Sequence, residues 1–165
     1  MVSVLPQLEE LKGAALDFVF PRFCVGCGKE GDFICNACQA SLPWIESPIC
    51  PKCGKLQTGL VLCPNCNNWE ADIDAICSPF RFEGVIRKTV HEFKYHNLAA
   101  IAGQLAHFLG DYLIDNPILY DVIVPVPLHY KRLKERGYNQ AALLSIELSR
   151  LTGIHVNGIS LIRCI

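Results

Sequence analysis

Eight cysteines fall into four C-x-x-C pairs, and this spacing is the clearest chemical signal in the chain. The eight are Cys24, Cys27, Cys35, Cys38, Cys50, Cys53, Cys63 and Cys66. A C-x-x-C turn directs two thiolates at one point, and two such turns complete the tetrahedral sulfur shell that zinc prefers. Glycine follows two pairs, at Gly28 and Gly54, where a left-handed backbone lets amides point at sulfur. We predict two structural Zn²⁺ sites, each closed to catalysis.

Other uses of these cysteines fit the sequence less well. A disulfide framework needs an oxidising compartment. Charged residues interrupt the apolar stretch 5–20 and no signal-peptide cleavage site follows it, so we expect a cytoplasmic protein. A thioredoxin-like motif uses a single C-x-x-C at the start of a helix. Iron–sulfur ligation is the strongest competitor, because thiolate ligand sets overlap, but the paired spacing favours zinc.

The four pairs can be grouped in two ways. A sequential arrangement joins the first two pairs in one site and the last two in the other, whereas a cross-braced arrangement interleaves them. Gaps of seven and nine residues inside the sequential sites close small loops at low entropic cost, so we predict sequential grouping. The other two cysteines, Cys77 and Cys164, have apolar neighbours and are predicted to be buried core thiols.

Composition and hydrophobic pattern divide the chain into three parts. With 51% hydrophobic and 19% charged residues it has the composition of a folded protein. A net charge of -1 excludes binding nucleic acid by bulk charge alone, and no apolar run reaches the roughly 18 residues of a membrane span. We predict an amphipathic helix over 1–20, a double zinc ribbon over 21–70 and an α/β part over 71–165.

The third part alternates predicted strands and helices. Hydrophobic spacing predicts helices over residues 85–96, 98–114 and 139–151. In the last of these, Asn139 is the expected N-cap and Gly153 the expected stop. Apolar and β-branched runs predict strands over residues 73–82, 121–125 and 154–165. This alternation is typical of an α/β fold with a parallel sheet buried on both faces.

A cationic segment follows the predicted strand 121–125, at the end of the sheet where ligands bind in such folds. Five basic side chains lie there against one acid: His129, Lys131, Arg132, Lys134 and Arg136. A cationic loop before a helix suits phosphate or pyrophosphate; Gly137 lets the backbone approach a ligand, and Asn139 and Gln140 add neutral donors. A solvated basic loop is the alternative, but the prolines before the segment and the Gly-Tyr-Asn-Gln after it favour function.

The sequence around this segment resembles a known family. IVPVPLHYKRLKERGYNQAALLSIELSRLTG, which begins at Ile123, closely resembles the ComF (GntX-like) family, whose members look like type I phosphoribosyltransferases. FRFEGVIRKTVHEFKYHN, which begins at Phe80, is similar to the family's segment before its first domain helices, and the four cysteine pairs match its double zinc ribbon. The resemblance runs from about Leu5 to Arg163.

The resemblance implies a phosphate site. The turn 125–129 would occupy the pyrophosphate-binding loop, and four later residues match the family's basic signature. With the glycine between them, the implied phosphate- or pyrophosphate-binding set is Pro125, Val126, Pro127, Arg132, Arg136, Gly137, Asn139 and Gln140. The fold class implied is a double zinc ribbon followed by an incomplete parallel-sheet phosphoribosyltransferase-like domain.

The sequence departs from the family in one respect. Type I phosphoribosyltransferases carry a later strand that ends in paired acids and a Thr/Gly-rich loop, which hold the phosphoribosyl group. The only adjacent acids here are Glu9 and Glu10, and the sequence reaches Ile165 before such a motif. We therefore expect a truncated catalytic domain that is inactive by itself, with Mg²⁺ bound only if a complete domain exists.

Two functions fit these features. The first is a phosphoribosyltransferase-like protein linked to competence and DNA uptake or to nucleotide metabolism, with a phosphorylated small molecule as ligand. The second is a non-catalytic zinc-ribbon adaptor that binds single-stranded DNA or a partner protein such as a competence helicase. The apolar run 160–165 also predicts an exposed sheet edge through which copies of the chain could self-associate. Trp44 and Trp69 are expected to pack against the ribbons rather than to stack on bases.

Overall fold

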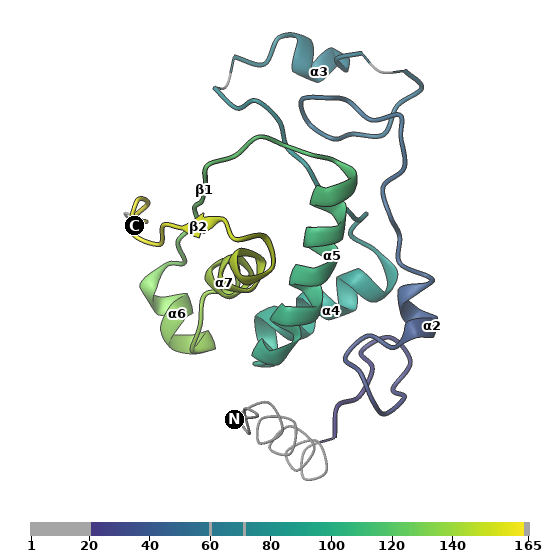
Figure 1. Ribbon diagram of the computed structural model, residues 1–165, viewed down its shortest axis with the longest axis vertical. Helices are drawn as coiled ribbons and strands as arrows, with labels where there is room; N and C mark the ends of the chain where they lie inside the picture. The colour runs from purple at the N-terminus through teal and green to yellow at the C-terminus, as the bar shows by residue number, and fades with distance from the viewer. Residues whose placement is uncertain (1–20, 60, 71, 164–165) are drawn as a thin grey trace, which may run out of the picture. The chain divides into compact units, whose positions relative to one another are not determined.

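The computed structural model describes residues 21–59, 61–70 and 72–163 (Figure 1). The amphipathic helix predicted over 1–20 and the thiol of Cys164 lie outside these residues. In chain order the elements are α2 (Asn36–Gln39), α3 (Pro64–Asn67), α4 (Gly84–Tyr95), η1 (Ala99–Ile101), α5 (Ala102–Asp115), β1 (Val122–Ile123), α6 (Tyr130–Arg136), α7 (Gln140–Thr152) and β2 (His155–Val156). No helix within the described ranges is long and apolar enough to cross a membrane.

The chain divides into two compact units at Ser41/Leu42. In the first unit, Phe23 and Glu30 form an antiparallel bridge that closes a tight hairpin around the first cysteine pair. The second pair begins α2, with Cys35 as the N-cap residue in an extended conformation. Ile34, next to it, is fully buried. Residues 21–41 of the first unit are therefore a hairpin followed by one turn of helix, and Cys24 and Ile34 are their buried apolar side chains.

The second unit repeats this arrangement and then continues into a helical region. Ile49 and Leu56 form the hairpin bridge, and Cys63 is the N-cap of α3. Pro64 at the first position of α3 suits a helix start, because its missing N–H has no intrahelical partner there. The same sequence pattern thus gives the same local backbone in both units.

The helical region has a core formed by α4, η1 and α5. Buried side chains there include Ile86, Phe93, Ile101, Leu105 and Phe108. An aromatic cluster extends this core: the ring centroids of Trp44 and Phe80 are 4.3 Å apart, and both rings contact Phe108. Burial of these large side chains is the main stabilising contribution to this region.

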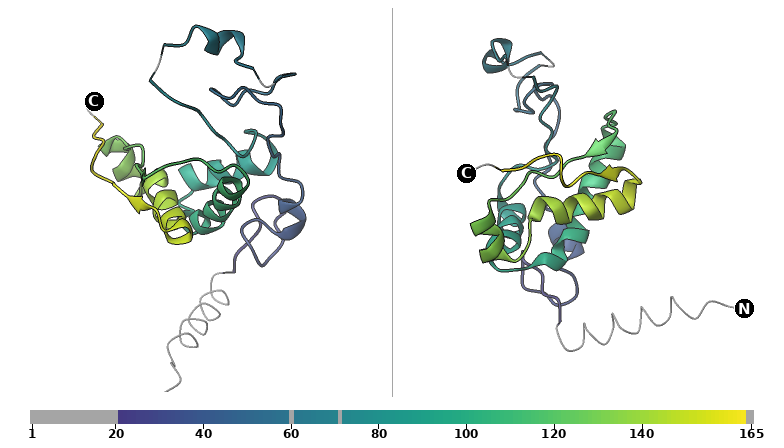
Figure 2. Two further views of the ribbon diagram at one scale, coloured as in Figure 1. Left: turned by 45° about the horizontal axis from the view of Figure 1, so that its top comes forward. Right: turned by 90° about the vertical axis from the view of Figure 1, so that its left-hand side faces the viewer.

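Helices α5 and α7 pack side by side, as Figures 1 and 2 show. Gly110 on α5 lies at this contact, and the space beside it would accommodate a Cβ in ordinary van der Waals contact. A Cβ added at Gly110 would lie 3.8 Å from Leu151 Cδ1 and 4.0 Å from Leu148 Cδ1. The contact joins α7, and the segment before it, to the helical core.

Strands β1 and β2 form a parallel pair, with Val122 opposite His155 and Ile123 opposite Val156. This confirms the α/β class and the parallel pairing, but both strands are much shorter than predicted. Val122 is 42% exposed, so burial of β1 on both faces was wrong. Of the predicted strand 154–165, only His155–Val156 is a strand in the described residues; residues 157–163 form none, and Ile159 and Ile162 are largely exposed.

Three further expectations need correction. Residues 73–82 hold no regular strand and contribute only the isolated bridge from Phe80 to Trp44. Cys77 is exposed rather than buried, because its segment runs over the surface instead of entering a sheet. The cationic segment is not a loop: residues 130–136 form α6.

Candidate functional site

The structure brings the eight paired cysteines together in two groups of four. In each group the sulfur atoms all lie within 4.8 Å of one another. The first cysteine cluster comprises Cys24, Cys27, Cys35 and Cys38, and the second comprises Cys50, Cys53, Cys63 and Cys66. This is the sequential grouping rather than the interleaved one.

The sulfur geometry fits zinc. A tetrahedral ion with Zn–S bonds of about 2.3 Å places its sulfurs about 3.8 Å apart. Cys27 Sγ and Cys35 Sγ are 3.6 Å apart in the first cluster, and Cys53 Sγ and Cys63 Sγ are 3.8 Å apart in the second. Four thiolates with this spacing are consistent with one structural zinc ion in each cluster, and they leave no ligand position for a substrate.

Backbone amides support the sulfurs in matching positions. Cys35 N donates to Cys24 Sγ, and Cys63 N donates to Cys50 Sγ, each at 3.4 Å. Burial raises the pKa of Cys24, but amide hydrogen bonds from Cys35 and its own turn outweigh this and lower it to about 6. The amide of Cys63 is the largest cause that lowers the pKa of Cys50 to about 6. These amides favour the thiolate form that a metal requires.

One thiol in each cluster has a raised pKa instead of a lowered one. A hydrogen bond with Cys24, together with burial, raises the pKa of Cys38 to about 12. Burial, followed by hydrogen bonds with Cys53 and Cys63, raises the pKa of Cys66 to about 12. Without a cation the four sulfurs therefore share protons unequally, so zinc binding at either cluster must displace protons.

Glycines with positive φ complete the two hairpins, as the sequence predicted. Gly28 has φ of 76° and Gly54 has φ of 70°. Their amides donate to Cys24 O and Cys50 O, which tightens each C-x-x-C turn. The two positions differ in one respect: a Cβ at Gly54 would lie 2.8 Å from Ile76 O, whereas a Cβ at Gly28 meets no atom within 4 Å.

Side chains outside the cysteine set pack around the second cluster. Trp69 packs against its buried cysteines, as predicted for the tryptophans. Lys52 Nζ donates to Trp69 O at 2.8 Å and lies 5.2 Å from the centroid of the indole ring. Trp44, in contrast, packs on Phe80 and Phe108 rather than on a ribbon.

The cationic segment forms α6 because both of its ends are capped. His129 is the N-cap, and its Nδ1 accepts from Lys131 N at 3.3 Å. Gly137 ends the helix in the left-handed conformation, with its N–H bonded to Leu133 O. The polar sequence between these residues has only Leu133 as an apolar anchor, so hydrophobic spacing gave no signal for this helix.

Several predicted phosphate ligands already have protein partners. Arg132 pairs with Glu135 at 3.0 Å on the exposed face of α6. Arg136 donates to Gln140 Oε1 at 3.1 Å and lies 5.1 Å from the centroid of the Tyr95 ring. Asn139 caps α7 by accepting from Ala141 N and also donates to Val126 O. Their role in ligand binding stays a prediction.

Gln140 is buried and joins α7 to α4. Its Nε2 donates to Phe93 O at 3.4 Å, and the Tyr138 hydroxyl donates to the same oxygen at 2.6 Å. This carbonyl needs both partners because Phe93 lies close to the end of α4, where backbone oxygens have no intrahelical donor. The Tyr-Asn-Gln block thus connects the segment to the helical core.

A cavity of about 560 Å³ lies beside the start of α6. We call it the α6 cavity; its lining residues are Pro127, Leu128, His129, Tyr130, Lys131, Leu161, Ile162 and Arg163. Of the predicted phosphate-binding set, Pro127 lines it and Arg132 and Arg136 do not. Lys131 and Arg163 supply its positive charge. Sequence reasoning did not include Arg163 in the site, because only the pairing of β1 with β2 returns the chain to this point.

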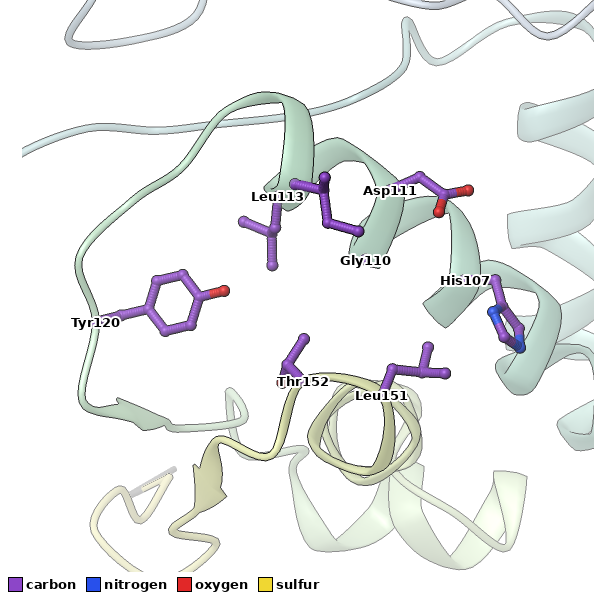
Figure 3. Close-up of a pocket in the computed structure, with 8 residues that line it drawn as sticks. His107, Gly110, Asp111, Leu113, Tyr120, Leu151 and Thr152 are labelled. Atoms are coloured by element: carbon purple, nitrogen blue, oxygen red, sulfur yellow. The ribbon is translucent and has the colours of Figure 1, made fainter.

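A second cavity, of about 410 Å³, lies between the ends of α5 and α7 and the segment before β1 (Figure 3). Tyr120 reaches toward Leu113 and Thr152, and His107 and Asp111 lie at the α5 side. The sequence gave no signal for this cavity, because its walls come from three separate segments with no common motif.

Comparison with known proteins agrees with this architecture. A family described as "Double zinc ribbon domain" matches residues 15–67. Competence protein ComFC of Bacillus subtilis is 31% identical over 129 residues, which are 74% of this chain and 54% of that protein. The chain is a homologue of the ComF competence proteins. Competence protein F of Haemophilus influenzae is 34% identical over 139 residues, or 77% of this chain and 59% of that protein.

The two alignments cover only part of each relative. The chain spans somewhat more than half the length of both ComF relatives. No solved structure matches it significantly. The zinc-ribbon assignment and the ComF resemblance drawn from the cysteine array and the RGYNQ block are thus confirmed.

Proposed function

We propose that the chain acts in competence-linked DNA uptake as a phosphoribosyltransferase-like protein, and that its α6 cavity binds the phosphate groups of a phosphorylated ligand. The observation that carries this proposal is the cavity itself. It lies at the segment that resembles the pyrophosphate loop of type I phosphoribosyltransferases, and it is lined by Lys131 and Arg163. The names of both relatives support the link to competence.

The lining residues suit phosphate. Lys131 and Arg163 provide charge-assisted donors, and an arginine can hold two phosphate oxygens at once. Pro127 stiffens the turn before α6, which limits the entropy lost when a ligand orders it. The proposal is one of binding: the paired acids that would hold a phosphoribosyl group for transfer have no counterpart near this cavity among the residues 72–163 that the structure describes.

Calorimetric titration of the zinc-loaded chain with pyrophosphate tests the proposal. We expect the double substitution Lys131→Ala/Arg163→Ala to weaken binding at least about 10-fold, because two charge-assisted hydrogen bonds are lost. The matched control is Arg81→Ala/Arg150→Ala, which also removes two charges, both from exposed ion pairs with Glu83 and Glu147. Equal weakening by the two double variants would show that net positive charge, and not the α6 cavity, binds pyrophosphate. Absence of pyrophosphate binding would also contradict the proposal.

Single-stranded DNA is a second candidate ligand, favoured by one observation. Tyr130 is 68% exposed and its ring lies beside the tilted ring of His129, with centroids 4.7 Å apart, at the start of the basic helix α6. An exposed aromatic ring beside lysines is the usual platform for stacking a base. Fluorescence anisotropy with an oligothymidine tests this: because Tyr130 also lines the α6 cavity, Tyr130→Ala should weaken DNA binding by a larger factor than it weakens pyrophosphate binding, since pyrophosphate has no ring to stack on. If Tyr130→Ala binds the DNA as well as wild type, this second function is wrong.

A further inference from the structure

We propose that His91, Glu92 and His96, at the end of α4, form a third metal site that takes one divalent transition-metal ion such as Ni²⁺ or Zn²⁺. Their ligand atoms all lie within 4.8 Å of one another. Among the described residues, this trio and the two cysteine clusters are the groups whose His, Cys, Asp or Glu side chains converge in this way. The trio is separate from both clusters in sequence and in ligand type.

The three side chains meet at the end of α4. His91 and Glu92 lie on its last turns, and His96 follows as the C-cap residue, with φ of -118° and ψ of 23°. Asn97 then adopts a left-handed conformation, with φ of 56°, so the chain turns at the helix end instead of continuing along the axis. In a continuous helix, residues 91 and 96 would lie about 140° apart around the axis. In this structure the two rings nevertheless lie 5.4 Å apart between centroids.

Existing contacts hold each ligand near its place. His96 Nδ1 and Glu92 Oε2 are 2.8 Å apart, which is already close to the spacing of two ligands on one ion. The ring of His91 packs against Tyr95, with centroids 4.7 Å apart. Tyr95 is in turn covered by the guanidinium of Arg136. These contacts reduce the side-chain entropy that is lost when an ion binds.

The ligand chemistry differs from that of the cysteine clusters. Two imidazoles and a carboxylate suit Ni²⁺, Cu²⁺, Co²⁺ and Zn²⁺, whereas four thiolates select soft or borderline ions. Two neutral imidazoles and one carboxylate carry one negative charge, so they do not fully neutralise a dication. Three protein ligands also leave positions for water or an added ligand. The side chains of His96 and Glu92 are 56% and 35% exposed, so an ion can enter from solvent.

Calorimetric titration with Ni²⁺ tests the proposal. The chain is used without a polyhistidine tag, with zinc in both cysteine clusters, after passage over a weak chelating resin that removes loosely held metal. We expect one Ni²⁺ per chain. His96→Gln should weaken binding at least about 10-fold, because it removes one of three ligands, and His91→Gln should do the same. His107→Gln, which changes an exposed histidine on α5 outside the trio, should bind Ni²⁺ as wild type does.

Two further measurements identify the ligands. Zinc added to the same protein should shift the imidazole nitrogen resonances of His91 and His96 and leave that of His107 in place. Absence of a sulfur-to-nickel absorption band shows that Ni²⁺ has not displaced zinc from the cysteines. If Ni²⁺ fails to bind, or if wild type and His96→Gln bind it equally, the trio is only an exposed ion pair beside a histidine and the proposal is wrong.

Discussion

The two cysteine clusters share a local design and differ in their surroundings. Each has a hairpin with a C-x-x-C turn and a following glycine, then a cysteine that caps one turn of helix. In the first cluster Cys27 is exposed and only Cys24 is buried. In the second, Cys50, Cys63 and Cys66 are all buried and Trp69 packs against them.

This difference shows that a zinc ribbon has two separate properties: the convergence of its four sulfurs and the access of solvent to its ion. Spacing and turn geometry decide which four sulfurs converge, and these are nearly the same in both clusters. Burial and neighbouring side chains decide how readily solvent or a competing ligand reaches the ion. The four predictions below test this separation, beginning with the change that should have the largest effect.

Removing one ligand should abolish zinc binding at that cluster alone. We expect Cys50→Ser to reduce the zinc content from two ions to one and to unfold residues around the second cluster, because structural zinc supplies about 10 kcal/mol or more of folding free energy. Elemental analysis and circular dichroism measure both effects. Cys27→Ser should also leave one ion. The control Cys77→Ser, at an exposed thiol outside both clusters, should keep two.

Replacing the turn glycine by alanine should destabilise the second cluster more than the first. Gly28→Ala costs about 1–2 kcal/mol because φ is positive there. Gly54→Ala should cost about 1–3 kcal/mol more, since its Cβ would meet Ile76 O at 2.8 Å. Thermal unfolding of the zinc-loaded variants compares them. Equal losses would show that Ile76 moves away freely.

The first cluster should release zinc faster than the second. Exposure of Cys27 gives a chelator direct access to one ligand, whereas the second cluster must open before it is attacked. The single-site variants Cys50→Ser and Cys27→Ser retain the first and second ions respectively, so stopped-flow release to a coloured chelator reports each ion separately. We expect the first to be lost about 10-fold faster, on the order of 1.4 kcal/mol in activation free energy. The reverse order would show that burial does not control access.

The smallest effect should come from Lys52. Lys52→Ala removes its hydrogen bond to Trp69 O and its contact with the indole ring, which together contribute about 1 kcal/mol. Chemical denaturation of the zinc-loaded chain measures this. Lys55→Ala is the matched control, because Lys55 is an exposed lysine of the same hairpin. If Lys52→Ala lowers the free energy of unfolding no more than Lys55→Ala does, Lys52 does not stabilise the second cluster.

Local sequence predicted the features that local chemistry determines. The cysteine grouping, the caps Asn139 and Gly153 of α7, and the helix α4 all depend on residues a few positions apart. Long-range features were harder to predict. Cys77 has apolar neighbours in sequence yet lies on the surface, and the apolar run near Ile162 reads as a strand but has no partner strand in the described part of the chain.

The candidate phosphate site shows the same limit. Its charge was visible in the sequence, but α6 was missed because its two caps, His129 and Gly137, stabilise a helix with almost no hydrophobic period. The distribution of the cations was also not predictable. Arg132 and Arg136 have partners on the protein, while Arg163 reaches the cavity from a distant part of the chain.

The short parallel pair β1–β2 has a consequence for cooperativity. It closes a loop that contains all of α6 and α7, and it does so through two facing residue pairs and a bond from Asn157 N to Ile123 O. Both walls of the α6 cavity therefore exist only while this loop is closed. Closing this loop costs chain entropy. A ligand that contacts both walls, residues 127–131 and 161–163, would hold the loop closed, so its binding free energy would be linked to the pairing of β1 with β2. Opening of the pair, seen by amide exchange at Asn157, should then slow in proportion to ligand occupancy.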